Sequence, residues 1–115
     1  MGLNFSLVRK GKYDDGEEFQ TVVFSTNITH NLGKMAEASG IYNPLWRPDE
    51  NGFENAKDII DILEKGLIEL KNNPTEYKKY DSENGWGLYI HFVPFVEAVL
   101  NACKEYPEST INACR

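Results

Sequence analysis

The chain has 115 residues, of which 41% are hydrophobic and 26% charged, so we expect residues 1–115 to form one folded domain. Its formal net charge is -6 at pH 7, which argues against nonspecific binding to DNA, RNA or anionic membranes, because that needs clustered lysine and arginine. No stretch approaches the roughly 20 apolar residues of a membrane-spanning helix. The start, "MGLNFSLVRK", is too short and too alternating for a signal peptide, so we expect a cytoplasmic protein.

The first two segments predict an antiparallel hairpin. Leu3, Phe5 and Leu7 alternate with polar residues, which is the period of a half-buried strand. The stretch "FQTVVFS" at 19–25 is rich in β-branched and aromatic residues, as strands are. Between them lies "KGKYDDGEE", whose Asp15-Gly16 pair is a strong turn signal.

A first helix is predicted from Thr29, a good N-cap, to about Ser39, with Gly40 placed to end it. Residues 41–54, "IYNPLWRPDENGFE", contain two prolines and predict a long loop. The loop is also unusually apolar, which indicates that it packs against the rest of the domain.

A second helix is predicted from the cap Asn55 to the "NNP" at 72–74, because its apolar residues fall on one face. A third helical stretch runs from about Trp86 to Glu105, and Pro94 should kink it or mark its true start.

The C-terminal "STINACR" predicts a short strand that pairs with the hairpin. The expected order is therefore β-β-α-α-α-β, an α+β domain in which three helices cover one face of a small antiparallel sheet. Cys103 and Cys114 are expected to be free thiols, although a disulfide stays possible if the last strand folds back past the last helix.

Three separated stretches are rich in polar and aromatic residues: "THNLGKMA" (29–36), "IYNPLWRP" (41–48) and "NGWGLYIH" (84–91). We expect them to converge on one partly cationic cleft for a small, anionic, nucleotide-like ligand. The candidate ligand-binding residues are His30, Asn31, Lys34, Tyr42, Trp46, Arg47, Asn84, Trp86 and Tyr89.

Each residue type has a role in that hypothesis. Either indole would stack on a base, since aromatic faces pack well against planar groups. Lys34, Arg47 and the N-terminus of the first helix would hold phosphates. Asn31, Asn84 and His30 would form hydrogen bonds with the polar edges of the ligand.

The same residues also have structural interpretations. His30 and Asn31 would simply complete the helix cap, and each indole would anchor the core. Arg47 would pair with the acids that follow it, and Asn84-Gly85 would form a turn. The binding hypothesis therefore depends on the three stretches being enriched together.

Enzymatic signals are weak. The chain has no nucleophile elbow, zinc-protease motif or phosphate-binding loop, and Cys103 has no adjacent histidine. His30 and His91 alone do not define a metal site, so we expect neither a metal nor a cofactor. Acid–base catalysis by His30 with a carboxylate remains an alternative.

At these stretches the chain resembles a family of small phage and prophage proteins. The similar motifs are "NITHNLGKMAEASGIY", "LWRP", "AKDIIDILEKGL", "NGWG" and "VLNACKEYP", within residues 27–107. The resemblance implies a phage setting and no established catalytic activity. Small acidic phage proteins include sponges, oligomers that sequester nucleotide messengers of host immunity.

The expected function is thus a non-enzymatic phage protein that sequesters a nucleotide immune messenger of the cyclic oligonucleotide or cyclic ADP-ribose type. It would act as a homo-oligomer in the cytoplasm of the infected cell and so inhibit host defence. The alternative is an inhibitor that contacts a host enzyme directly. That alternative predicts an exposed apolar patch at Tyr42, Leu45 and Trp46.

Overall fold

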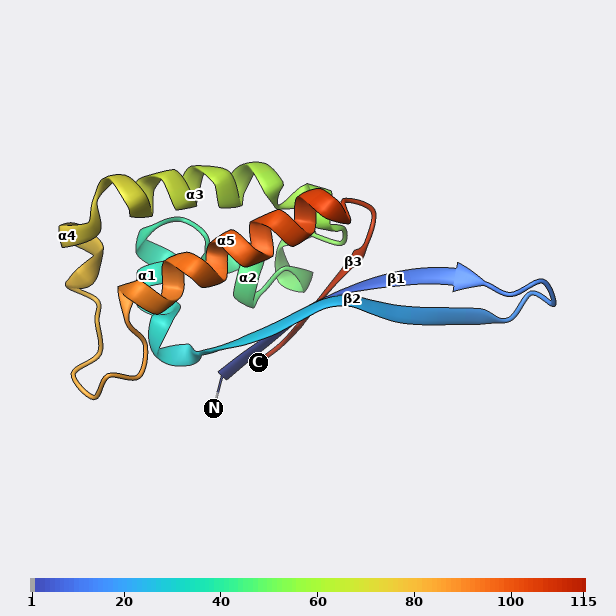
Figure 1. The fold of residues 1–115 in the computed structure, drawn as a ribbon, viewed down its shortest axis with the longest axis horizontal. Helices are drawn as coiled ribbons and strands as arrows, with labels where there is room; N and C mark the ends of the chain where they lie inside the picture. The colour runs from blue at the N-terminus through green and yellow to red at the C-terminus, as the bar shows by residue number, and fades with distance from the viewer. Residues whose placement is uncertain (1) are drawn as a thin grey trace.

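Three strands form one antiparallel sheet in the computed structural model, which describes residues 2–115 (Figure 1). β1 (Gly2–Lys12) and β2 (Glu18–Thr29) make the hairpin, and β3 (Thr110–Cys114) pairs with β1 on its other side. The strand order is β2-β1-β3. The predicted α+β fold, with an N-terminal hairpin and a C-terminal strand, is confirmed.

The hairpin is longer than predicted. β1 continues to Lys12, so the turn shortens to residues 13–17, with Gly16 at a φ of 89°. β3 pairs only with Asn4–Val8 of β1, so residues 9–21 form a two-stranded ribbon, here called the arm. The arm projects from the body (Figure 1) and raises the radius of gyration to 15.0 Å, against about 13.4 Å for a compact chain of this length.

The helices lie together on one side of the sheet (Figure 1). Their order along the chain is η1 (His30–Leu32), α1 (Gly33–Ala38), α2 (Tyr42–Trp46), η2 (Asp49–Asn51), η3 (Ala56–Asp58), α3 (Ile60–Asn72), α4 (Pro74–Lys78) and α5 (Tyr89–Glu105). The three predicted helices correspond to η1 with α1, to η3 with α3, and to α5. The short α2 and α4 were not predicted.

The predicted signals at the first helix are confirmed, but the helix is short. The Thr29 hydroxyl accepts the Asn31 N–H at 3.3 Å, and Gly40 ends the segment with a φ of 81°. The start is a 3-10 turn, and six α-helical residues follow.

The predicted loop at 41–54 contains α2, which corrects the prediction. Pro44 is compatible with a helix here because it lies in the first turn, where its missing N–H has no helical acceptor. Pro44, Leu45 and Trp46 are buried. The expectation that this stretch packs down is therefore confirmed.

The two long helices, α3 and α5, pack against each other and over the sheet. A capping box begins η3, the 3-10 turn that leads into α3: the Asp58 carboxylate accepts the Asn55 N–H at 3.0 Å. α5 begins at Tyr89 rather than Trp86, and it continues through Pro94, whose side chain is exposed. Gly66 of α3 lets that helix approach Ile41, because a Cβ there would lie 2.1 Å from Ile41 Cγ2.

The core lies between the helices and one face of the sheet. Leu3, Phe5 and Leu7 point into it from β1, as their alternation predicted. Cys103 is buried there, and burial raises the pKa of its thiol to about 12. Cys114 is exposed on β3, and both cysteines are free. None of the helices within residues 2–115 is long and apolar enough to cross a membrane.

Candidate functional site

A cleft of about 480 Å³ opens between α1 and α2, and we call it the α1–α2 cleft. Its lining combines cationic, aromatic and hydrogen-bonding side chains from the first two predicted stretches with a residue of the C-terminus. The lining residues are His30, Gly33, Lys34, Glu37, Tyr42, Trp46, Arg47 and Arg115. Five of the nine predicted residues therefore come together in one place.

His30 is fixed by the indole beneath it. The Trp46 Nε1–H donates to His30 Nδ1 at 3.0 Å. Because Nδ1 is the acceptor, the neutral imidazole carries its proton on Nε2 and keeps that N–H as a donor. His30 is half-buried at the cleft, so it both supports the core and lines the site.

Tyr42, rather than Trp46, offers its ring to the cleft. Trp46 is 2% exposed, and Tyr42 is half-buried above it with ring centroids 5.4 Å apart and planes 13° apart. The predicted stacking of a base on Trp46 is therefore wrong for this arrangement. Trp46 is a core anchor, and the planar surface that remains accessible belongs to Tyr42.

Two arginines at the rim converge on one carboxylate. Arg47 Nη1 lies 2.6 Å from Glu50 Oε2, and Arg115 Nη2 lies 3.2 Å from the same oxygen. The Tyr42 hydroxyl and Glu50 raise the pKa of Arg47 above its usual value. The predicted pairing of Arg47 with a following acid is thus present, and it leaves Arg47 at the edge of the cleft.

Arg115 was missed in the sequence. Its guanidinium donates to the Trp46 carbonyl at 2.9 Å, across 69 positions of the chain. The predicted C-terminal strand was the available signal, because pairing β3 with β1 returns the chain end to the body. The strand prediction did not specify which residue Arg115 would contact.

Asn31 and Asn84 act as braces of the 84–87 loop. Asn31 Nδ2 donates to the Trp86 carbonyl at 2.8 Å, and Asn84 Oδ1 accepts the Trp86 N–H at 3.0 Å. Gly87 has a φ of 106°, and a Cβ on it would lie 2.9 Å from Asn31 Cβ. The loop and the first helix are therefore in close contact, but through backbone and amide groups that do not line the α1–α2 cleft.

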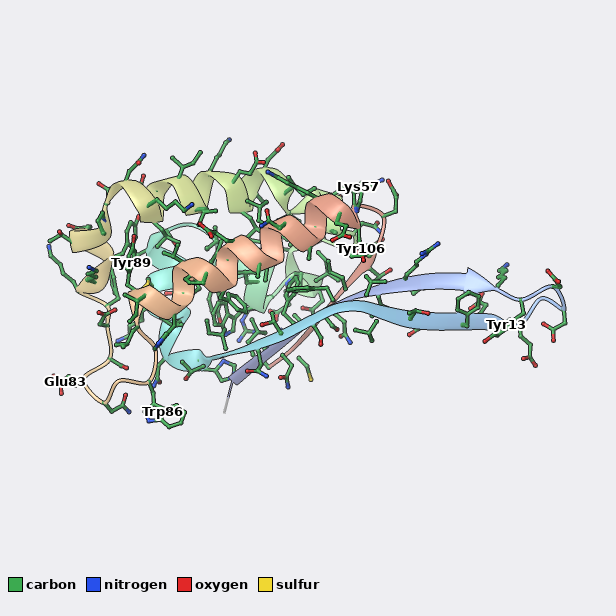
Figure 2. The ribbon with its side chains drawn as sticks, viewed as in Figure 1. Tyr13, Lys57, Glu83, Trp86, Tyr89 and Tyr106 are labelled. Carbon is green, nitrogen blue, oxygen red and sulfur yellow. The ribbon has the colours of Figure 1, made fainter. Side chains whose placement is uncertain are left out.

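Trp86 and Tyr89 also lie outside that cleft. Trp86 is 69% exposed and points away from the body (Figure 2). It lines a separate depression of about 350 Å³ with residues of β1 and β2. The Tyr89 hydroxyl donates to the Leu70 carbonyl at 2.7 Å. The prediction that all three stretches form one cleft is therefore wrong for the third.

The helix N-terminus contributes less than predicted. A 3-10 turn of three residues and six α-helical residues align few peptide dipoles. Any binding of an anion in the cleft therefore depends on its cationic side chains. Among residues 2–115, no group of three or more His, Cys, Asp and Glu side chains is arranged to hold a metal ion.

Comparisons with protein-family models, with curated proteins and with solved structures find no match for this chain. The resemblance to small phage proteins stays a prediction.

Proposed function

We propose that this protein binds a small phosphate-bearing ligand with a planar group, of the nucleotide class, in the α1–α2 cleft and holds it without converting it. The resemblance to phage proteins favours a nucleotide messenger of host immunity, of the cyclic oligonucleotide or cyclic ADP-ribose type. Sequestration of that messenger would inhibit host defence.

The carrying observation is that three cationic side chains, two of them arginines, line one cleft of an acidic molecule. The chain has a net charge of -6, yet Lys34, Arg47 and Arg115 line the same cleft. Three acids stand against them: Glu37 in the lining, and at the rim Glu50, which contacts both arginines, and Asp49, which lies 3.5 Å from Arg115. Guanidinium groups match phosphate oxygens geometrically, so a ligand phosphate can replace a carboxylate as the partner of these arginines.

Size and shape also support a nucleotide-class ligand. A volume of about 480 Å³ lies within the roughly 300–1,000 Å³ of small-molecule sites. The Tyr42 ring, held parallel to the buried indole, supplies a flat apolar face beside the cations. Phosphate recognition and stacking are thus available side by side.

Binding without conversion is supported by the hydrogen bond of His30. A histidine that acts as a general base usually has a carboxylate or carbonyl to orient one nitrogen, which leaves the other free to accept a proton. Here Nδ1 is occupied by an indole N–H, and the proton of the neutral ring is on Nε2. The same geometry suits a hydrogen-bond donor to a ligand.

The alternative function, an inhibitor that contacts a host enzyme, requires an exposed apolar patch that is not present at the predicted residues. Leu45 is fully buried and Trp46 is 2% exposed, so the apolar patch expected at Tyr42, Leu45 and Trp46 is not on the surface. A Trp46→Ala variant would destabilise the fold, so it could not serve as a test of a protein contact. Ligand binding is therefore the function that this region supports best.

The direct test is thermal unfolding with a panel of ligands. Nucleosides, nucleoside monophosphates, cyclic dinucleotides and ADP-ribose derivatives are added separately, and inorganic phosphate serves as the anion alone. A bound ligand at 100 times its Kd should stabilise the fold by about 2.7 kcal/mol. We expect phosphate-bearing compounds to stabilise and the matching nucleosides to have little effect.

Lys34→Ala should weaken binding at least tenfold, because it removes a cation from the lining. The matched control is Lys65→Ala, an exposed lysine of α3 that does not line the cleft. Equal binding by the two variants, or no stabilisation by any phosphate compound, would reject the proposed site.

Glu50→Gln gives a second, opposite test. Glu50 holds both arginines at the rim, so a ligand phosphate must compete with its carboxylate. Removing that charge should tighten binding of the phosphate compounds roughly severalfold. Weaker binding would mean that Glu50 positions the arginines instead of competing with the ligand.

A further inference from the structure

The arm carries aromatic side chains on one face. Phe19 lies over Gly11, where a Cβ would come 2.4 Å from the ring, and Tyr13 packs on Phe19 with centroids 4.8 Å apart. Tyr13 is nevertheless 58% exposed. A two-stranded ribbon is marginally stable alone in water, so an exposed aromatic face on one is a candidate interface.

A depression of about 640 Å³ lies at the base of the arm, where it leaves the body. We call it the corner. Arg9 and Lys10 of the arm form one side, and residues 105–110, at the end of α5 and the turn into β3, form the other. That second side carries Glu105 and Glu108, and Glu108 is paired with Lys57 at 3.1 Å, so three cations face two acids at the corner. Figure 2 shows Tyr106 beside this junction and Tyr13 near the far end of the arm. Each molecule thus has a projecting aromatic surface and a hollow.

Charge is distributed unevenly along the arm. Its base carries Arg9 and Lys10, and its tip carries Asp14, Asp15 and Glu17, while Lys12 and Glu18 lie opposite each other between the two. Two arms side by side in opposite directions bring each acidic tip against the other's basic base. Arms in the same direction bring like charges together. The acidic tip also opposes binding to a nucleic-acid backbone.

The free edge of β1 is poorly suited to the same pairing. Beyond Val8 this edge has no strand beside it, but antiparallel pairing of two copies about residues 10 and 11 would set Arg9 opposite the second copy's Lys12. Like charges directly opposite each other destabilise a sheet, and cations on an edge prevent such pairing. Contact through the faces of the arms avoids this repulsion.

We infer that the arm is a dimerisation element whose occupant is a second copy of this chain. The aromatic face of each arm lies in the corner of the other molecule, with the two arms antiparallel about a two-fold axis. Such an interface is isologous, since each copy gives an arm and receives one. The Phe19 and Tyr13 rings then meet Arg9 and the Tyr106–Pro107 turn of the second copy, where stacking and cation–π contacts are possible.

This inference does not depend on the proposed ligand. The corner includes Thr110, at the start of β3, and the α1–α2 cleft includes Arg115, just after the strand ends. The two surfaces are therefore at opposite ends of β3. A change at the corner can abolish dimers and leave ligand binding intact.

The experiment is sedimentation equilibrium of the full chain over a range of concentrations, with charge swaps at the two ends of the arm. One variant carries Asp14→Lys and Glu17→Lys. These changes spare Gly16 and Asp15, whose carboxylate accepts the Glu17 N–H at 2.9 Å in the turn. The other variant carries Arg9→Glu and Lys10→Glu. Each should raise the dimer Kd at least tenfold, and the four changes combined in one chain should restore it to within about threefold.

For the variant with Asp14→Lys and Glu17→Lys, the matched control is Asp61→Lys with Glu83→Lys, which makes the same net charge change at exposed positions away from the arm and the corner. It should leave the dimer Kd unchanged. Melting temperatures of all variants report whether the body remains folded. A wild-type monomer at every concentration, or failure of the combined variant to regain the dimer while it stays folded, would overturn the inference.

Discussion

The α2 segment and the 84–87 loop each carry a tryptophan in a polar and aromatic setting, and the structure uses the two indoles in opposite ways. Trp46 is 2% exposed and donates to His30 from within the core. Trp86 is 69% exposed, while the backbone that carries it is held by Asn31 and Asn84. In α2 the Trp46 side chain supports the cleft. In the 84–87 loop the neighbouring asparagines hold the backbone, and the Trp86 side chain does not.

The difference shows that burial, and not residue type, decides what an aromatic side chain contributes. A buried indole stabilises by the area it removes from water and by its one satisfied N–H. An exposed indole on a braced loop contributes little to folding. Substitutions of the two tryptophans should therefore differ by several kcal/mol in their effect on the free energy of unfolding.

Trp46→Ala should have the largest effect. It removes a large core side chain and leaves His30 Nδ1 without its donor, so we expect a loss of about 3–5 kcal/mol in the free energy of unfolding. Urea denaturation measures it directly. A loss below 1 kcal/mol would mean that Trp46 is not the anchor of α2.

Gly87→Ala should have the next largest effect, because the loop is shaped around this glycine. Its φ of 106° and the 2.9 Å approach of a Cβ to Asn31 Cβ both oppose a side chain, with an expected cost of about 1–3 kcal/mol. Gly85→Ala is the matched control. It shares the positive φ, at 79°, but nothing lies within 4 Å of its Cβ. Equal losses would show that the contact with Asn31 adds nothing.

The sequence predicted the features that local patterns encode. Alternation at Leu3, Phe5 and Leu7 gave β1, and Thr29 and Asn55 were identified as caps. These signals act within a few residues, so they survive without knowledge of the rest of the fold. The length of the arm was underestimated because glycine and lysine weaken the strand pattern just where β1 continues.

Local sequence patterns could not predict which segments line the same cleft. Arg115 reaches Trp46 through the pairing of distant strands, and the burial of Trp46 follows from the packing of α2 as a whole. The third stretch does adjoin the first, but through Asn31 and the Trp86 carbonyl, and not through the side chains that made it a candidate. Such outcomes depend on long-range packing, which no short motif specifies.

Asn31→Ala tests that junction with a smaller expected effect. It removes the amide that donates to the Trp86 carbonyl, and the loss of one hydrogen bond costs about 0.5–1.5 kcal/mol. Asn31→Asp is the comparison, since it keeps the size of the side chain but loses the donor. Hydrogen exchange should show faster opening at residues 84–87 in both variants. Unchanged exchange would mean that the loop is held by other contacts.

Trp86→Phe should have the smallest effect on stability and the clearest effect on fluorescence. Because the side chain is exposed, the free energy of unfolding should change by less than about 0.5 kcal/mol. The variant leaves Trp46 as its single indole, so its emission should shift to shorter wavelength and become nearly insensitive to acrylamide. In the wild type, the exposed indole should supply most of the quenchable signal. If the variant is quenched as readily as the wild type, then Trp46 is reachable from solvent, and the contrast between a buried and an exposed tryptophan is lost.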